Sequence, residues 1–394
     1  MSPQVETEEL IASGAFRQAL EIAAGQAADV DRRGRFPSET LEALRAAGAL
    51  GWSVPREYGG AGAHIGELSQ ATLELSRRCA TSGMAFAMHH IQVASIARHL
   101  GGGSPWFEDY LRRVAREQRL IASATSEVGV GGDLRRSIAA VQPPSADGLV
   151  QFEKRGSTIS YGAQADDLLT TVRRGPNAEP GDQVLVLTHQ SQMEMTQTGE
   201  WDTLGMRGTC SPGFVVKASF HPDQILPVPF GAIAAETMVP YSHILWAHVW
   251  LGIATDASSR AQNFVRAQAR QSPGTIPPTA LRLSELSARM AQFRALVQTA
   301  TDEYLDLADK DGRRELSTVG YAVRINNLKI AASELVFEAC YGALRICGFA
   351  GYGNCGPYSV ARQLRDAGSA ALQIANDRLH ATNAALLTVY REGK

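Results

Sequence analysis

The spacing of apolar residues changes twice along the 394-residue chain. Residues 1–120 carry apolar side chains at helical spacing and are rich in alanine, as in ELIASGAFRQALEIAAGQAADVD. Residues 121–235 contain short β-branched runs such as QVLVLT and GFVVKASF, separated by Pro, Gly, Asn and Asp. Helical spacing returns in residues 236–394. This order predicts an α+β, mostly α fold with an N-terminal helical domain, a small central antiparallel β-barrel domain and a C-terminal antiparallel helical bundle.

The composition excludes several classes of partner. Lys+Arg 38 against Asp+Glu 40 gives a net charge of -2, so no general attraction to nucleic acid or membranes is expected. The densest apolar run, residues 244–254, is too short to span a bilayer. The acidic N-terminus lacks the basic and apolar regions of a signal peptide. Five scattered cysteines show no metal-binding spacing with histidine and fit reduced thiols, so we expect a soluble cytoplasmic protein with no metal.

The stretch CYGALRICGFAGYGNCGPYSVARQLRDA, residues 340–367, combines a helical run, a Gly-rich turn and an Arg-rich end. Open backbone beside fixed cations such as Arg362 and Arg365 can bind a diphosphate. An ordinary helix–loop–helix connection explains the same letters equally well.

Four motifs in their order resemble the acyl-CoA dehydrogenase flavoprotein family. They are WSVPREYGGAG, SATSEVGVGGD, WDTLGMRGTCSPGF and the 340–367 stretch. The second is similar to the family's Thr-Glu-Pro-Gly-Ala-Gly-Ser-Asp signature, and the fourth to its Gly-rich turn followed by Arg-Asp-Ala. The resemblance covers nearly the whole chain. It implies a FAD-binding subunit, with FMN possible, that assembles as a homotetramer or homodimer.

A flavin ring needs hydrogen-bond partners along its polar edge, and small hydroxyls near backbone amides provide them without crowding. The resemblance implies this role for Ser126, with Gly131 allowing close approach of the backbone. It implies the same for Ser160, while Thr158 replaces the Trp that covers the ring in the family. The alternatives are a β-turn hydroxyl at Ser126 and an ordinary half-buried strand for the other two.

The resemblance implies further cofactor-binding residues in the C-terminal half. Arg270 lies where the family carries an Arg that contacts the FAD diphosphate across a subunit boundary, although a solvated Arg at a helix end is an equal alternative. The remaining candidates are Arg345, Gly348, Phe349, Gly351 and Asn376.

The catalytic carboxylate of the family has no counterpart in this sequence. Its usual position falls at Ile374 and its alternative position near Ser242. In the family this group removes the α-proton of an acyl thioester while flavin N5 accepts the β-hydride. Because an imidazole takes a proton near neutral pH, His243 is the candidate for a displaced base. This interpretation predicts an FAD-dependent oxidoreductase that oxidises an acyl substrate, bound to coenzyme A, to a carrier protein or to neither.

Two other functions remain open. The C-terminal residues resemble the branch of the superfamily that contains flavin-dependent hydroxylases, which use reduced flavin and oxygen on aromatic, amine or sulfur substrates. In such an enzyme the missing carboxylate is expected, and His89, His90, His243 and His248 are available as hydrogen-bond donors. Each of these histidines is also explained as a structural group. Finally, the fold can persist as a non-redox member of a biosynthetic assembly.

Overall fold

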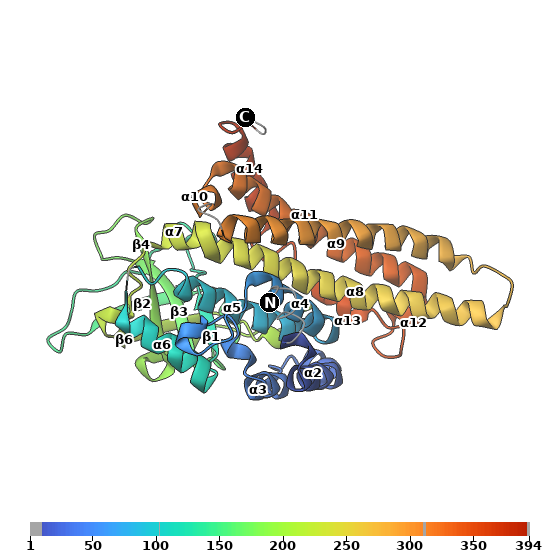
Figure 1. Cartoon of the computed structure of the whole chain (residues 1–394), viewed down its shortest axis with the longest axis horizontal. Coiled ribbons are helices and arrows are strands. Elements are labelled where there is room, and N and C mark those ends of the chain that lie inside the picture. Colours follow the sequence, from blue (N-terminus) through green and yellow to red (C-terminus); the bar gives the residue numbers. More distant parts are fainter. Residues whose placement is uncertain (1–9, 102, 310–312, 392–394) are drawn as a thin grey trace.

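A computed structural model describes residues 10–101, 103–309 and 313–391 of the chain. The helices precede and follow the strands, so the predicted fold class is confirmed (Figure 1). The N-terminal helices are α2 (Gly14–Arg33), α3 (Ser38–Ala46), α4 (Ile65–Arg78), α5 (Ala80–Ala97) and α6 (Pro105–Glu117). The domain boundaries after residues 120 and 235 stay predictions.

Local sequence explains where α4 begins. His64 accepts the backbone N–H of Gly66 at 3.1 Å through Nδ1, and the Glu67 carboxylate accepts the N–H of His64 at 2.8 Å. This reciprocal capping satisfies donors that the first turn of a helix leaves free. The next helix, α5, is buried around nearly its whole circumference, which suits its Ala-rich and apolar sequence.

The strands form two three-stranded sheets (Figure 1). The first has the order β1 (Ile121–Ala124), β3 (Asp167–Arg173) and β4 (Gln183–His189); the second has β2 (Val150–Gly156), β6 (Phe214–Phe220) and β5 (Met193–Gln197). The predicted antiparallel barrel needs correction in one detail, because β1 pairs with β3 in parallel. Parallel pairing needs a long crossover, and the connection between these two strands includes all of β2.

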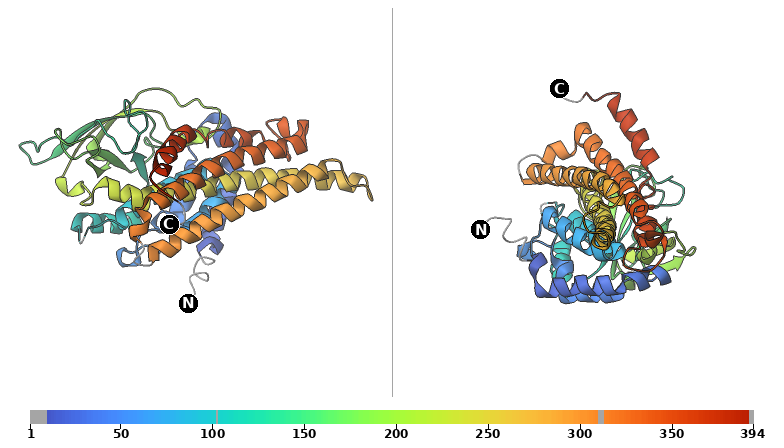
Figure 2. Two further views of the ribbon diagram at one scale, coloured as in Figure 1. Left: turned by 90° about the horizontal axis from the view of Figure 1, so that it is seen from above. Right: turned by 90° about the vertical axis from the view of Figure 1, so that its right-hand side faces the viewer.

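Long helices make up the C-terminal part. They are α8 (Val239–Gln271), α9 (Thr279–Asp309) and α11 (Val319–Cys347), with the shorter α7 (Phe230–Ile233), α10 (Arg313–Leu316), α12 (Phe349–Tyr352), α13 (Ala361–Ala367) and α14 (Asn376–Leu387). A π-helical turn, Ala234–Met238, leads into α8. The long helices lie side by side, and the α8–α9 end projects well beyond the sheets (Figures 1 and 2). No helix in the described parts of the chain is long and apolar enough to cross a membrane.

Helix α8 packs against both α4 and α11. At Gly252 a Cβ would lie 2.6 Å from the Ser76 Cβ and 2.8 Å from the Leu73 carbonyl oxygen. Only glycine lets the two helices approach this closely. The N-terminal and C-terminal helices therefore share one continuous core.

Two of the quoted motifs meet at a junction between the sheets and the C-terminal helices. The buried Asp366 carboxylate accepts the Met206 N–H at 2.6 Å, and burial raises the pKa of Asp366 to about 6. Its neighbour Arg365 donates to Asp31 of α2 at 2.8 Å. Arg365 thus connects helices within one chain, which favours the helix–loop–helix interpretation of this segment over a diphosphate grip.

Candidate functional site

A Gly-rich loop follows β1 and meets the start of α14. Gly129, Gly131 and Gly132 have φ values of 96°, 61° and 75°, a region that other residues rarely adopt. A Cβ at Gly132 would fall 2.7 Å from Nη1 of Arg378 in α14. The loop therefore presents open backbone beside a guanidinium group. Arg378 was missed in the sequence, because an Arg on a helix gives no local signal of what it faces.

The predicted hydroxyls lie on loops next to this glycine-rich turn. Ser126 Oγ donates to the Thr158 carbonyl oxygen at 2.7 Å and accepts the Thr158 N–H at 3.2 Å. Both Thr158 and Ser160 follow the end of β2, so the alternative that they belong to a half-buried strand is wrong. Ser160 Oγ accepts a hydrogen bond of 2.9 Å from Ser211. Ser211 lies in the third motif. Its hydroxyl could have been recognised there as a candidate hydrogen-bond partner, but the sequence analysis did not name it.

Buried contacts hold the glycine-rich loop at its base. The Glu127 carboxylate accepts from Ser137 Oγ and from the Ala139 N–H, both at 2.7 Å. The Lys154 ammonium lies 3.6 Å from the same carboxylate and donates to the Thr171 carbonyl oxygen at 2.7 Å. Burial lowers the pKa of Lys154 to about 8, while the negative charge of Glu127 acts in the opposite direction. The loop is therefore fixed at its base, and of its three glycines only Gly131 has open space beside it.

The segment between α13 and α14 carries the position of the missing carboxylate. Lys329 of α11 donates to the Ile374 carbonyl oxygen and to Asn376 Oδ1, each at 2.7 Å. Asn376 Nδ2 also donates to Ser333 Oγ at 3.1 Å. Burial lowers the pKa of Lys329 to about 8. A buried cation is thus bonded to the backbone of the residue at the carboxylate position, and the sequence analysis did not single it out.

His243 of α8 is buried, and its Nδ1 lies 3.0 Å from the Ile325 carbonyl oxygen. A carbonyl only accepts hydrogen bonds, so Nδ1 carries a proton. Burial lowers the pKa of His243 to about 4, which makes it a weak proton acceptor at neutral pH. His89 and His90 are buried and bonded to the Leu50 and Ala49 carbonyl oxygens.

The other predicted cofactor residues lie at the far end of the helical bundle. Gly348 ends α11, fifteen positions after Ser333, which corresponds to roughly 22 Å along a helix. Phe349 beside it is 93% exposed, and Arg270 is exposed one residue before the end of α8. The candidates at this end are Arg270, Arg345, Gly348, Phe349 and Gly351. Within one chain, the structure does not bring them to Ser126, Gly131, Thr158, Ser160 and Asn376, and a cofactor role for either group stays a prediction.

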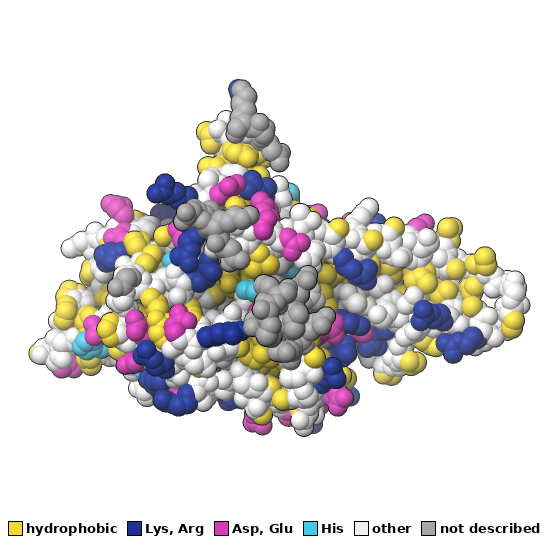
Figure 3. Space-filling model, viewed as in Figure 1, with side chains coloured by type: hydrophobic (Ala, Val, Ile, Leu, Met, Phe, Trp, Pro, Cys, Tyr) yellow, Lys and Arg dark blue, Asp and Glu magenta, His cyan; other side chains and the backbone are white. Residues whose placement is uncertain are grey.

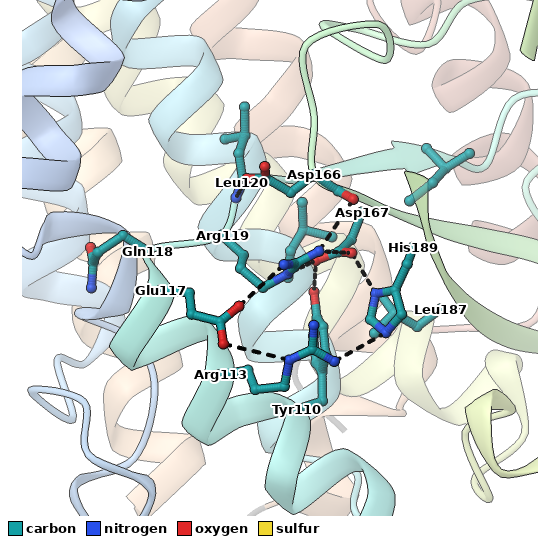
Figure 4. A network of polar contacts seen from close by, with 12 residues as sticks. Tyr110, Arg113, Glu117, Gln118, Arg119, Leu120, Asp166, Asp167, Leu187 and His189 are labelled. Atoms are coloured by element: carbon teal, nitrogen blue, oxygen red, sulfur yellow. Dashed lines mark hydrogen bonds and ion pairs between the residues drawn. The ribbon is translucent and has the colours of Figure 1, made fainter. Parts of the chain in front are cut away.

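Two further polar features are a hollow that adjoins the base of the glycine-rich loop and a buried network in the first sheet. A hollow of about 900 Å³ opens over the β2–β6–β5 sheet, and none of the predicted cofactor residues lines it. Its wall includes charges of both signs, such as Arg155, Arg173 and Glu194. The second feature is a buried network that joins α6 to β3 and β4 around Asp167 (Figure 4).

In the Asp167 network, several hydrogen-bond donors offset the negative charge of the buried carboxylate. Its carboxylate accepts from Tyr110 at 2.7 Å, from Arg119 at 2.6 and 2.7 Å, and contacts His189 Nδ1 at 2.6 Å (Figure 4). Burial alone would raise the pKa of Asp167, but these donors together lower it. The network is a structural connection, since its acid is already satisfied by donors from the chain itself.

Known proteins match the chain over most of its length. The family model described as acyl-CoA dehydrogenase, N-terminal domain, matches residues 6–118, and the one described as acyl-CoA dehydrogenase, C-terminal domain, matches residues 231–373. A dibenzothiophene monooxygenase from Rhodococcus qingshengii is 27% identical over 355 residues, which cover 82% of this chain and 81% of the relative. The amino sugar nitrososynthase DnmZ from Streptomyces peucetius is 25% identical and covers 86% and 82% of the two chains. Among solved structures, FMN-bound TdsC from Paenibacillus sp. A11-2 superposes with a TM-score of 0.81 at 21% identity and covers 96% and 98%.

These relatives correct the predicted function. The expectation of acyl thioester oxidation with hydride transfer to FAD is wrong, because the similar chains include monooxygenases and a nitrososynthase. The role of His243 as a base for an α-proton is withdrawn with it. The physical reason lies in the sequence, where Ile374 and Ser242 occupy the two carboxylate positions. The family itself is confirmed: the chain belongs to the acyl-CoA dehydrogenase superfamily.

Proposed function

We propose that this protein is a flavin-dependent monooxygenase that transfers one oxygen atom from O₂ to a small aromatic, amine or sulfur substrate. The observation that carries the proposal is the 27% identity with a dibenzothiophene monooxygenase along four fifths of the chain. The carboxylate needed for α-proton removal is replaced by Ile374, whose carbonyl is bonded to Lys329. The proposed reaction removes no α-proton and therefore needs no base at that position.

The residues around the glycine-rich loop, where it meets the start of α14, fit a flavin. Ser126 and Ser160 offer hydroxyls for the polar edge of the ring, and Gly131 offers open backbone in a left-handed conformation. The Arg378 guanidinium beside Gly132 would offset a negative charge on the cofactor. We propose FMN as the form bound, as in TdsC. When bound, the flavin supplies the electrons that activate oxygen.

At position 374 the chain carries an uncharged isoleucine and therefore no fixed anion. The Lys329 ammonium donates to Ile374 O and Asn376 Oδ1, which fixes the segment that enters α14. His243 at neutral pH is an uncharged imidazole with Nδ1–H turned to a backbone carbonyl. The chain would therefore position groups through neutral hydrogen bonds and the two cations Lys329 and Arg378, a setting for an uncharged or electron-rich substrate.

The test supplies purified protein with reduced FMN, ¹⁸O₂ and either dibenzothiophene or indole, the molecule bound in one TdsC structure. We expect one ¹⁸O atom in the product by mass spectrometry, with catalase present to exclude oxidation by free peroxide. Ser126→Ala should weaken FMN binding roughly tenfold, since one hydrogen bond is lost. Ser145→Ala, in the exposed turn before β2, is the matched control. Anaerobic bleaching of bound flavin by an acyl thioester would contradict the proposal.

We also propose that the protein is a cytoplasmic homo-oligomer, a homotetramer or homodimer as the resemblance implied. Large apolar side chains are exposed along the second half of α11 and in α12, namely Phe337, Tyr341, Phe349 and Tyr352. Apolar atoms also lie along the projecting helical arm in Figure 3. Exposed apolar surface of this kind is typical of subunit contacts. A monomer in sedimentation velocity at micromolar concentration would contradict this proposal.

A further inference from the structure

Lys329 is a buried cation whose hydrogen-bond partners are neutral. It has no exposed surface, and in the described parts of the chain its ammonium donates to the neutral oxygens of Ile374 and Asn376. The ring of Trp250 lies on another side, with its centroid 5.8 Å from Nζ. Within residues 10–101, 103–309 and 313–391, no carboxylate forms an ion pair with Lys329. A buried charge without a counter-ion is costly, so its position needs a reason beyond packing.

The residue that Lys329 holds has an unusual backbone. Ile374 has a φ of 51°, in the left-handed region that β-branched side chains avoid. Such a conformation persists only where surrounding contacts impose it. The bond from Lys329 to the Ile374 carbonyl is one such contact, and the Asn376 N–H, donated to Ala371 O at 3.0 Å, is another.

The held segment leads directly to the glycine-rich loop. Asn376 begins α14, and two residues later Arg378 lies against Gly132. A change in the backbone at Ile374 would therefore move both the Asn376 amide and the Arg378 guanidinium. Through these two side chains, Lys329 would influence how α14 lies against the glycine-rich loop, although it is not itself in contact with that loop.

We propose that Lys329 is a positioning residue, whose ammonium fixes Ile374 in the left-handed conformation, orients Asn376 and so sets α14 against the glycine-rich loop. This inference rests on the proposed function only for its effect on turnover. Its structural part concerns the chain alone.

The charge state of Lys329 gives the inference a pH dependence. Burial lowers the pKa of Lys329 to about 8, and the negative charge of Glu334, further along α11, opposes this shift. From α8, His243 is the titratable group that Lys329 influences, and it is neutral at this pH. The ammonium is present below pH 8 and is lost as the pH rises through that value. Positioning should weaken over the same range.

The first test compares Lys329→Met, Lys329→Arg and Lys217→Met in hydrogen–deuterium exchange without flavin. Lys217 is an exposed lysine of β6 and controls for the loss of a lysine. We expect amides of residues 372–379 to exchange at least roughly tenfold faster in Lys329→Met, with wild-type exchange elsewhere and in Lys217→Met. Wild-type exchange of residues 372–379 in Lys329→Met would overturn the inference. If Lys329→Met does not fold, Asn376→Ala removes one of the two acceptors and should loosen the same segment.

The second test follows ¹⁸O transfer against pH. Wild-type turnover should fall as the pH rises through about 8, and Lys329→Arg should extend turnover to higher pH, because a guanidinium keeps its charge. A wild-type pH profile in Lys329→Arg would count against positioning by charge. If no variant turns over but residues 372–379 still loosen in Lys329→Met, the proposed function fails while the positioning role stands.

Discussion

Two buried charges in this molecule have opposite surroundings. Asp167 is an anion that accepts from Tyr110, Arg119 and His189, and its pKa is lowered despite its burial (Figure 4). Lys329 is a cation that, among the described residues, is bonded to neutral oxygens, and its pKa is also lowered, by burial. For an acid a lowered pKa means that folding favours the charge, while for a base it means that folding opposes it. Asp167 therefore contributes to stability, and Lys329 reduces it.

The difference separates a structural buried charge, Asp167, from one for which we propose a positioning role, Lys329. A satisfied network such as that of Asp167 connects α6 to the first sheet and presents no group to a ligand. A buried charge that pairs with no carboxylate of the described residues, such as Lys329, is retained against a stability cost, as is common at functional sites. The following experiments would break or sharpen this distinction.

The largest effect is expected for Asp167→Asn. The substitution removes the buried one of two carboxylates that pair with Arg119, the other being the more exposed Glu117, and breaking a buried pair costs about 3–5 kcal/mol. Urea denaturation measures the free energy of unfolding. A loss of less than about 1 kcal/mol in the free energy of unfolding would show that the Asp167 network does not have the stabilising role assigned to it.

The second experiment uses pH. With a folded pKa of about 8 for Lys329, against 10.5 as its ordinary value, the unfolded chain binds more protons between these limits. The contribution of Lys329 to the free energy of unfolding should therefore rise with pH from about 8 to 10.5, by up to about 3 kcal/mol. The measurement is the wild-type free energy of unfolding minus that of Lys329→Met across this range. A difference that does not change with pH would show that Lys329 is not a destabilising charge.

The third experiment asks whether the end of α14 is tightly fixed against the loop. Gly132→Ala and Gly131→Ala share the strain of a positive φ, about 1 kcal/mol each. Only at Gly132 does the new Cβ meet Arg378, since nothing lies within 4 Å of it at Gly131. We expect Gly132→Ala to weaken FMN binding severalfold more than Gly131→Ala in a fluorescence titration. Equal weakening of FMN binding in the two variants would mean that the Arg378 side chain moves aside without affecting FMN binding.

The smallest effect on the free energy of unfolding is expected for Asp182→Asn, which serves as the reference for a solvent-exposed ion pair. Asp182→Asn removes an ion pair with Arg174 in which both side chains are nearly half exposed. Exposed pairs of this kind contribute less than about 1 kcal/mol. The free energy of unfolding should thus change far less than in Asp167→Asn, and a comparable loss would show that burial is not what distinguishes the Asp167 network.

The sequence predicted local structure well because local structure depends on neighbouring residues. Helical spacing in residues 8–120 and after 236, and β-branched runs between them, gave the correct order of helices and sheets. The parallel pairing of β1 with β3 was missed, because pairing across forty intervening residues leaves no mark in either strand. Ser126 and Thr158 were both singled out from their motifs and are hydrogen-bond partners in the structure, while their role in cofactor binding stays a prediction.

The sequence by itself determined the family and the absence of a carboxylate at Ile374, since both are read directly from residue identities. Only the tertiary structure decided that Lys329 is buried and bonded to Ile374, and that Arg378 lies against Gly132. A lysine in a helix is normally solvated, and its burial depends on segments distant in sequence that pack over it. Residue identity thus fixes which chemistry is possible, while packing fixes which charges lie close enough to act on it.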